Sequence, residues 1–192
     1  MRALTVEEYK QIIAAMETGS EGRSIEKLGV TYRKNMKIAT ALKTQALTGL
    51  RIGDVLELKL SSFVKDQQGN YRFDIVEQKT GKPRNFQIPR SVYDMLATFA
   101  IDNDKGKNDR LFDTNTRNVQ KYLAVICADL ELKDISTHSF RKLFATTMYE
   151  RSGHDIEAVR RLLQHSSATV TQRYIGIEDS KLNDLASSLD YE

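Results

Sequence analysis

The amino-acid sequence predicts a mainly helical protein of the α+β class, in which one small antiparallel sheet accompanies the helices. Three observations lead to this fold. Capping residues and terminating glycines frame several helical segments, residues 71–78 alternate apolar and polar side chains as strands do, and the motif KTGKP after them is typical of a hairpin turn. The length of 192 residues fits one domain, or one large domain and one very small one.

The chain is expected to begin with a helix over residues 5–16, because Thr5 is a favourable N-cap and a glutamate three residues later completes a capping box. Three glycines within residues 19–30 predict a loop. A longer helix over residues 31–48 follows, and Gly49 ends it because glycine readily adopts the left-handed conformation of a C-terminal cap.

The sheet is expected in the middle of the chain. A short helix near residues 52–57 precedes the strand 71–78, and residues 84–88 supply a second strand that KTGKP joins to the first. Six further helices are predicted after the sheet, and Ser91 is expected to cap the first of them. They cover residues 91–100, 115–130, 138–151, 155–164, 167–174 and 178–189.

The composition is that of a globular protein, with 40% apolar and 29% charged residues. The single cysteine, Cys127, excludes an intramolecular disulfide framework and fits a reducing cytosol. No apolar run approaches the ~18 residues that a membrane span needs, and the first residues, MRALTVEEYK, lack the apolar stretch of a signal peptide. We therefore expect a cytoplasmic protein without a membrane partner.

Charge is distributed unevenly along the chain. The net charge of +3 by itself argues against a strongly basic nucleic-acid-binding protein. However, residues 21–51 carry a net charge of +5 and residues 79–90 one of +4, whereas residues 175–192 carry −4. Local basic patches set the affinity for phosphate, so the two basic segments are compatible with a nucleic-acid partner. Solvated faces of the protein explain such runs equally well.

Two arginines, a lysine, two histidines and a tyrosine are candidates for catalysis: Arg51, Lys79, His138, Arg141, His165 and Tyr174. Guanidinium groups can neutralise a phosphate, lysine and histidine can move protons, and a tyrosine with a pKa of about 10 needs such help to act as a nucleophile. The sequence has no metal-ligand spacing, no P-loop and no Gly-x-Ser-x-Gly motif. This inventory indicates phosphoryl transfer without a metal or cofactor. Taken singly, each residue is equally compatible with a helix cap, an exposed polar face or ordinary packing.

Five motifs follow one another in a specific order: TGLRIGDVLEL, EQKTGKPRNFQIP, THSFRK, LLQHSS and a tyrosine nine residues after the last histidine. In this order and at these spacings the sequence resembles the catalytic domain of the tyrosine recombinase (phage integrase) family, over nearly the whole chain. The resemblance implies a helical catalytic domain with a small antiparallel sheet.

The resemblance implies a role for each residue of the first two motifs. Arg51 resembles the first catalytic arginine, and Asp54 resembles the acidic residue that supports the site. Lys79 resembles the lysine of the β-hairpin, which is the expected general acid for the leaving 5′-hydroxyl. Lys82 lies in the same turn and remains the alternative to Lys79.

The later motifs supply the rest of the implied site. His138 and Arg141 resemble the histidine and second arginine of the family's box, and His165 resembles the last histidine, which contacts the scissile phosphate. Tyr174 resembles the nucleophile that forms a 3′-phosphotyrosine link. One departure is Gln164, which stands where members of the family often have glycine.

The implied function is that of a site-specific DNA recombinase or integrase that cleaves and rejoins strands for integration or excision of a mobile element in a bacterial host. Two alternatives stay open: a type IB topoisomerase-like enzyme that relaxes DNA, and a non-catalytic DNA-binding regulator. The implied partner is double-stranded DNA, on which the full-length protein forms a homotetramer, whereas a monomer is the expectation for the chain alone. The basic residues offered as DNA contacts are Arg33, Lys34, Lys37, Lys43, Lys82 and Arg84.

Residues 1–177 are expected to form the catalytic domain, and residues 178–192 an acidic helical tail. An apolar stripe on this tail either packs on the core of its own chain or is exchanged with a neighbouring protomer. The N-terminal core-binding domain that closes around DNA in the family is expected to be absent, because few residues precede the catalytic core. DNA binding by the chain alone is therefore expected to be weak and sensitive to salt.

Overall fold

A computed structural model describes residues 2–20 and 31–176 of the chain. The chain divides into two compact units, Met1–Phe144 and Ala145–Glu192, which we describe separately. Within the described part, no helix is both long enough and apolar enough to pass through a bilayer.

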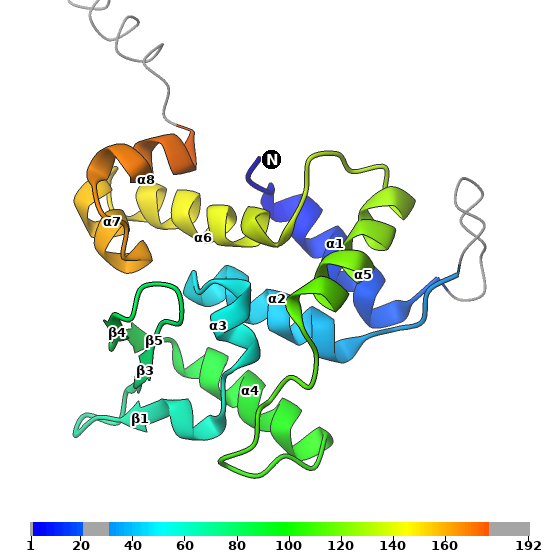
Figure 1. Ribbon diagram of the computed structural model, residues 1–192, viewed down its shortest axis with the longest axis horizontal. Helices are drawn as coiled ribbons and strands as arrows, with labels where there is room; N and C mark the ends of the chain where they lie inside the picture. Colours follow the sequence, from blue (N-terminus) through cyan, green and yellow to red (C-terminus); the bar gives the residue numbers. More distant parts are fainter. Residues whose placement is uncertain (1, 21–30, 177–192) are drawn as a thin grey trace, which may run out of the picture. The chain divides into compact units, whose positions relative to one another are not determined.

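The first helix, α1, spans Val6–Thr18 and forms as the sequence predicts (Figure 1). The Thr5 hydroxyl accepts a hydrogen bond from the backbone N–H of Glu8 at 3.1 Å, and the Glu8 carboxylate accepts one from the Thr5 N–H at 2.9 Å. The predicted capping box is therefore confirmed. The apolar face of α1 buries Ile12 and Met16 completely.

The second helix, α2, spans Met36–Thr48 and begins five residues later than predicted. Its N-cap is Asn35, whose side chain accepts a hydrogen bond from the backbone N–H three residues later at 3.1 Å. The residues before it run beside the end of α1, where the Ser20 N–H donates to the carbonyl of Tyr32 at 3.0 Å. The prediction of a helix over 31–48 is therefore wrong for its first five residues. Most of the predicted loop before them lies outside the described residues.

Gly49 ends α2 as predicted, with a φ of 65° in the left-handed region. A Cβ atom at this position would overlap the aromatic ring of Phe144 on helix α6. Helix α6 spans Thr137–Arg151 and carries the chain from the first unit into the second. Both the backbone conformation and the close approach of α6 therefore require glycine at the end of α2.

The predicted strands are present, but they are divided between two antiparallel sheets. Three strands form one sheet in the order β1-β2-β5, and two strands form the hairpin β3-β4. Their bounds are β1 Phe63–Lys65, β2 Tyr71–Phe73, β3 Ile75–Val76, β4 Pro83–Arg84 and β5 Gln87–Ile88. The chain passes from one sheet to the other at Asp74, so the expected single strand 71–78 is broken there. Strand β1 is an addition to the predicted set. In Figure 1 the strands lie at one edge of the first unit, away from α1 and α5.

Three further helices of the first unit follow the predicted segments closely: α3 Ile52–Leu56, α4 Arg90–Asp102 and α5 Thr116–Asp129. The prediction that Ser91 caps α4 is wrong, because Pro89 occupies the N-cap position and Ser91 lies within the first turn. Proline fits the start of a helix, since it has no N–H that would need a partner.

The helices of the first unit enclose one apolar core. Its largest fully buried side chains come from several elements and include Met16, Leu42, Leu96, Phe112 and Phe140. Truncating one such residue to alanine typically costs about 2–5 kcal/mol of stability. This core fixes the end of α2 and the starts of α3 and α6, near which candidate catalytic residues lie.

The second unit contains α7, which spans Ile156–Leu163, and α8, which spans Ala168–Ile175, as the sequence predicts. The Asp155 carboxylate caps α7 by accepting hydrogen bonds from two backbone N–H groups at 2.9 and 3.0 Å. The Ser167 hydroxyl caps α8 at 3.3 Å. The predicted helix over residues 178–189 lies outside the described residues.

Candidate active site

Arg51 precedes α3 as its N-cap residue, directly after the turn that ends α2. Its Nη1 donates to the carboxylate of Glu77, which lies at the end of β3, and its side chain remains 22% exposed. The structure gives its Nε and Nη2 no hydrogen-bond partner among the described residues. These two N–H groups can therefore form the bidentate fork that guanidinium groups make on phosphate oxygens.

Asp54 lies one turn after Arg51 on α3 and is buried. Its Oδ1 accepts a hydrogen bond from the backbone N–H of Gln78 at 2.9 Å, which ties α3 to the hairpin. Burial raises the pKa of the Asp54 carboxyl, and the nearby charge of Glu77 adds to that effect, whereas the positive charges of Arg51 and Arg141 oppose it. Asp54 thus belongs to the same electrostatic environment as both arginines, and its supporting role stays a prediction.

Lys79 lies in the turn between β3 and β4, where its side chain is exposed. The turn is closed by two backbone hydrogen bonds, from the Glu77 N–H to the Lys82 carbonyl at 3.0 Å and from the Gly81 N–H to the Glu77 carbonyl at 2.9 Å. The hairpin predicted from KTGKP is therefore present. It presents a flexible ammonium group on an ordered support.

His138 lies in the first turn of α6, and Arg141 follows it one turn later. Partial burial lowers the pKa of the His138 imidazole below its ordinary value, and the positive charges of Arg141, Lys79 and Arg51 lower it further. The first unit thus brings together four of the six predicted catalytic residues, three of them cations near a histidine whose pKa is lowered.

His165 and Tyr174 belong to the second unit and lie close together there. Their rings meet edge to face, with centroids 5.1 Å apart. The His165 Nδ1 lies 3.1 Å from the hydroxyl oxygen of Thr171, which in turn donates to the Ser167 carbonyl at 3.3 Å. Because that hydroxyl proton is used, Thr171 can accept a hydrogen bond from Nδ1–H and so fix the imidazole tautomer.

The loop that delivers His165 begins at Gln164, which has a φ of 55° in the left-handed region. The family resemblance favours a glycine here, and glycine is the residue that adopts this conformation most readily. Glutamine therefore makes this turn less favourable in free energy than glycine would, but it keeps the backbone conformation of the turn. The backbone N–H of His165 still donates to the Arg160 carbonyl at 3.1 Å.

Two residues of this arrangement were not singled out by the sequence. Glu77 is a fully buried carboxylate that contacts Arg51, and Thr171 contacts His165. A glutamate two residues before the hairpin lysine is a weak signal, because the sequence does not say that its side chain turns inward. Thr171 lies six residues after His165 across a helix cap, a separation that no simple periodicity marks.

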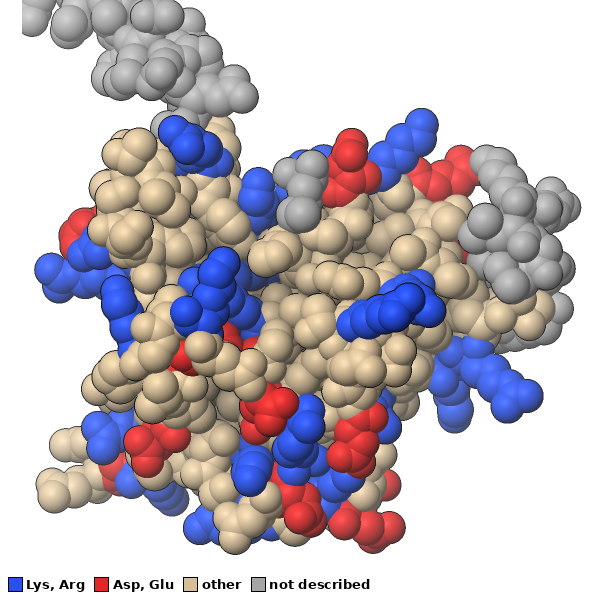
Figure 2. Space-filling view, viewed as in Figure 1, with Lys and Arg blue, Asp and Glu red and all other residues tan. Residues whose placement is uncertain are grey.

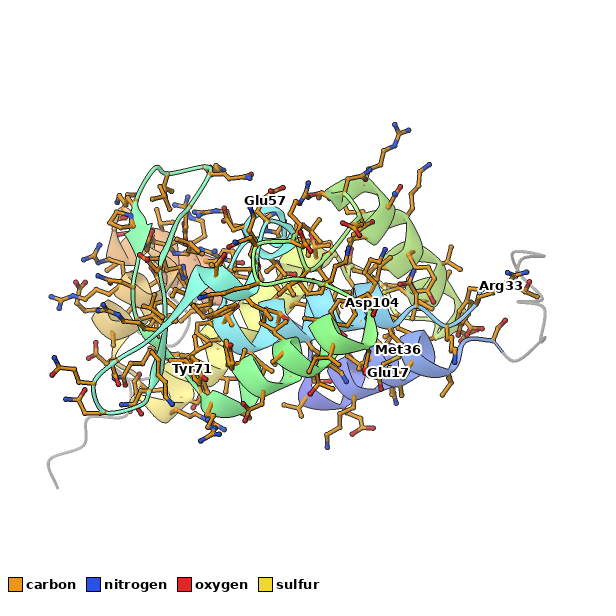
Figure 3. The ribbon with its side chains drawn as sticks, turned by 90° about the horizontal axis from the view of Figure 1, so that it is seen from below. Glu17, Arg33, Met36, Glu57, Tyr71 and Asp104 are labelled. Carbon is orange, nitrogen blue, oxygen red and sulfur yellow. The ribbon has the colours of Figure 1, made fainter. Side chains whose placement is uncertain are left out.

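The basic residues expected to contact DNA have different environments. Arg33 and Lys34 are exposed but precede α2, and Figure 3 places Arg33 at the end of the first unit opposite the strands. Lys37 is half-buried and donates to a backbone carbonyl at 3.3 Å. Lys43 is half-buried and forms an ion pair with Glu17 at the end of α1.

The last two of these residues, Lys82 and Arg84, both lie in the hairpin but differ in exposure. Lys82 is exposed in the turn, whereas Arg84 is 1% exposed and forms an ion pair with Glu77. The expectation that Arg84 contacts DNA is therefore wrong, because its guanidinium is buried and occupied. Burial lowers the pKa of Arg84 to about 10, so it remains charged at neutral pH. Figure 2 shows Lys and Arg side chains on the visible face over the hairpin region and, interspersed with Asp and Glu, around α4.

Comparison with known proteins agrees with these motifs. The model of the Phage integrase family matches residues 2–181. The probable integrase/recombinase YoeC of Bacillus subtilis (strain 168) is 35% identical over 139 residues, which cover 69% of this chain and 73% of that protein.

Two solved structures show the same fold. The catalytic domain of bacteriophage HP1 integrase matches with a TM-score of 0.63 at 22% identity, covering 98% of this chain and 95% of that one. The XerH site-specific recombinase, in a post-cleavage complex with palindromic difH substrate, matches with a TM-score of 0.65 at 24% identity, covering 97% of this chain and 53% of that one.

The chain spans only part of most of these relatives. Against four curated tyrosine recombinases it covers between 55% and 62% of their length. The family match nevertheless runs through both units and through every motif that carries a candidate catalytic residue. On this evidence the chain belongs to the phage integrase family.

Proposed function

We propose that this protein is a site-specific tyrosine recombinase, which cleaves and rejoins DNA strands through a covalent link to Tyr174 in the integration or excision of a mobile element. The observation that carries the proposal is the gathering of Arg51, Lys79 and Arg141 around His138 in the first unit. Such a group of cations suits a phosphodiester whose negative charge grows in the transition state. His165 and Tyr174 of the second unit complete the set of residues that the reaction requires.

In the first step the Tyr174 oxygen attacks the phosphorus, and the bond from phosphorus to the 5′-oxygen breaks. The phenol proton passes to a base, and the lowered pKa of His138 keeps its imidazole unprotonated near neutral pH, as a proton acceptor must be. Lys79 donates a proton to the leaving 5′-oxygen, and the positive charge of Lys79 near His138 supports its place in the site. The products are a 3′-phosphotyrosine and a free 5′-hydroxyl.

In the second step a 5′-hydroxyl attacks the phosphotyrosine, and the phenol is released with its proton restored. One phosphate ester replaces another in each step. The cycle therefore needs no nucleotide hydrolysis to reseal the strand. Arg51 and Arg141 hold the phosphate oxygens throughout, and His165 supplies a further hydrogen bond to them.

A nicked suicide substrate tests the proposal, because loss of a short 5′-fragment traps the covalent intermediate. We expect a protein–DNA adduct on denaturing gels that is absent for Tyr174→Phe. Arg51→Lys should slow adduct formation strongly, since an ammonium group cannot replace the bidentate fork. If the wild-type chain forms no adduct on any DNA, the protein is a binding protein rather than an enzyme. If Tyr174→Phe still forms one, the nucleophile is another residue.

Assembly belongs to the same proposal. The active form is a homotetramer on two DNA duplexes, and residues 178–192 contribute to contacts between protomers. DNA binding by this chain alone is weak and falls steeply with salt, because it depends on a few phosphate contacts. Deleting residues 178–192 should therefore alter assembly, measured by analytical ultracentrifugation on DNA, more than it alters affinity for a half-site. Unchanged assembly would remove the tail from the interface.

A further inference from the structure

Glu77 is a fully buried carboxylate held between two guanidinium groups. Its Oε2 contacts Nη1 of Arg51, and its Oε1 contacts Nη1 of Arg84. A carboxylate is rarely buried unless it is paired and hydrogen-bonded, and here both oxygens have a charged partner. The side chain of Glu77 therefore cannot move without leaving at least one buried charge unpaired.

Arg84 fixes this carboxylate to the body of the first unit. Its Nη2 donates to the Thr48 carbonyl at the end of α2 at 2.9 Å, and its Cζ lies 4.4 Å from the centroid of the Phe86 ring. Both contacts, together with complete burial, hold the Arg84 guanidinium in one place. Glu77 thus connects Arg51 to Arg84, which is itself fixed at the end of α2.

The backbone of Glu77 has a second task, because it closes the turn that carries Lys79. Its N–H and carbonyl make the two hydrogen bonds across the turn, and its Oε2 also accepts a hydrogen bond from the Thr80 hydroxyl at 3.3 Å. A single residue therefore connects the first arginine to the hairpin lysine. No other described side chain contacts Arg51 through a hydrogen bond.

We propose that Glu77 is a positioning residue for Arg51: its carboxylate, anchored by Arg84, holds Nη1 and thereby aims Nε and Nη2 at the scissile phosphate. The carboxylate is fully buried, so it influences the substrate through Arg51 rather than by direct contact. This role rests on the proposed strand-transfer function. The positioning role also explains why Arg51 is paired with the buried carboxylate of Glu77, although that pairing offsets part of the positive charge of Arg51.

Two variants separate positioning from stability. Glu77→Gln leaves the buried Arg84 without a carboxylate, so it should lower the melting temperature and slow adduct formation about 100-fold, the typical effect of an ångström-scale misplacement. Adding Arg84→Met removes the unpaired charge, and replacing both members of a buried ion pair is often neutral for stability when the new side chains pack well. We expect the double variant to regain thermal stability but to remain slow. Cleavage that returns with stability would overturn the proposal, as would a wild-type rate in Glu77→Gln.

A spectroscopic readout does not depend on cleavage. In ¹⁵N spectra of arginine side chains, a clamped guanidinium shows slow rotation about its Cζ–Nε bond, and comparison with Arg51→Lys assigns the resonance. We expect slow rotation of Arg51 in the wild type and fast rotation in the double variant. Equal rotation in both would overturn the clamp even if the enzyme is active. Absence of any DNA adduct, with the spectral difference intact, would instead reject the strand-transfer function alone.

Discussion

The ring of His165 stands at 80° to the ring of Tyr174, with the ring centroids 5.1 Å apart. Both residues belong to the second unit, and the helix caps of α7 and α8 set their separation. The relation between His165, the proposed phosphate-binding histidine, and Tyr174, the proposed nucleophile, is therefore a property of this small unit's own fold. Thr171 stabilises it by contacting the imidazole from within α8.

Thr171→Val tests that contact, because valine keeps the branched shape but lacks the hydroxyl. We expect adduct formation on the suicide substrate to slow by about tenfold, since the imidazole of His165 loses the partner that fixes its orientation. Affinity for DNA should stay unchanged in a gel-shift titration. Thr169→Val, at an exposed position of the same helix, is the matched control. Equal rates for the two variants would dismiss Thr171 as an orienting residue.

The lowered pKa of His138 predicts how activity depends on pH. Because the folded state holds this proton less tightly than the unfolded state does, His138 stays neutral to a lower pH than an ordinary imidazole, and cleavage should persist to correspondingly lower pH. By the same linkage, the stability that neutral His138 contributes to the fold is present above the pKa of the unfolded state. It is lost as the pH falls through the pKa of the folded state. An NMR titration of the imidazole measures the pKa directly. Arg141→Gln should raise this pKa by removing a nearby positive charge, and a fall would contradict the electrostatic account.

The hydrogen bond that Asp54 accepts from Gln78 leads us to expect different outcomes for two substitutions of Asp54. Asp54→Ala leaves the Gln78 N–H without its acceptor, so unfolding should become easier by about 1–3 kcal/mol in urea titrations. Asp54→Asn keeps an acceptor oxygen and should unfold close to the wild type at neutral pH.

The raised pKa of Asp54 also predicts how the stability of the wild type depends on pH. The folded state binds the carboxyl proton more tightly, so the stability linked to Asp54 is present at low pH and is lost as the pH rises through the folded pKa. Asp54→Asn should remove this dependence. An asparagine variant that retains it would assign the effect to another group.

Gln164 offers a test of backbone strain. Glycine adopts its left-handed conformation without a steric penalty, so Gln164→Gly should stabilise the second unit, by up to about 1 kcal/mol, in a calorimetric scan. Gln172→Gly, within α8, should instead destabilise it by a similar amount, because glycine weakens a helix interior. A lower melting temperature for Gln164→Gly would show that contacts of the glutamine side chain outweigh the strain.

Features that depend on neighbours in the sequence were predictable. Thr5 and Gly49 mark helix ends through local hydrogen bonds and backbone conformation, and both act as predicted. The start of α2 was not predictable in this way, since it depends on pairing between Ser20 and Tyr32 across a loop. A tertiary contact there overrides the helical pattern of the residues before Asn35.

The same distinction applies to the site. The residue types at positions 51, 79, 138 and 141 carried the prediction, and the first unit brings them together. Arg84 was misassigned because a cation in a basic turn usually faces solvent. Its burial depends on the ion pair with Glu77, which lies two residues beyond Ile75, the residue that pairs with Arg84 across β3–β4. The charge pattern of the sequence alone does not mark Glu77 and Arg84 as partners.

The contact between Gly49 and Phe144 has a consequence for divergence within the family. No side chain fits between the end of α2 and the ring on α6, so the two positions share one fixed volume. A β-carbon at position 49 becomes tolerable only after the aromatic ring at 144 has been lost, and the left-handed turn must change as well. Substitution should therefore proceed at 144 first, and homologues should never combine a bulky residue at 49 with an aromatic ring at 144.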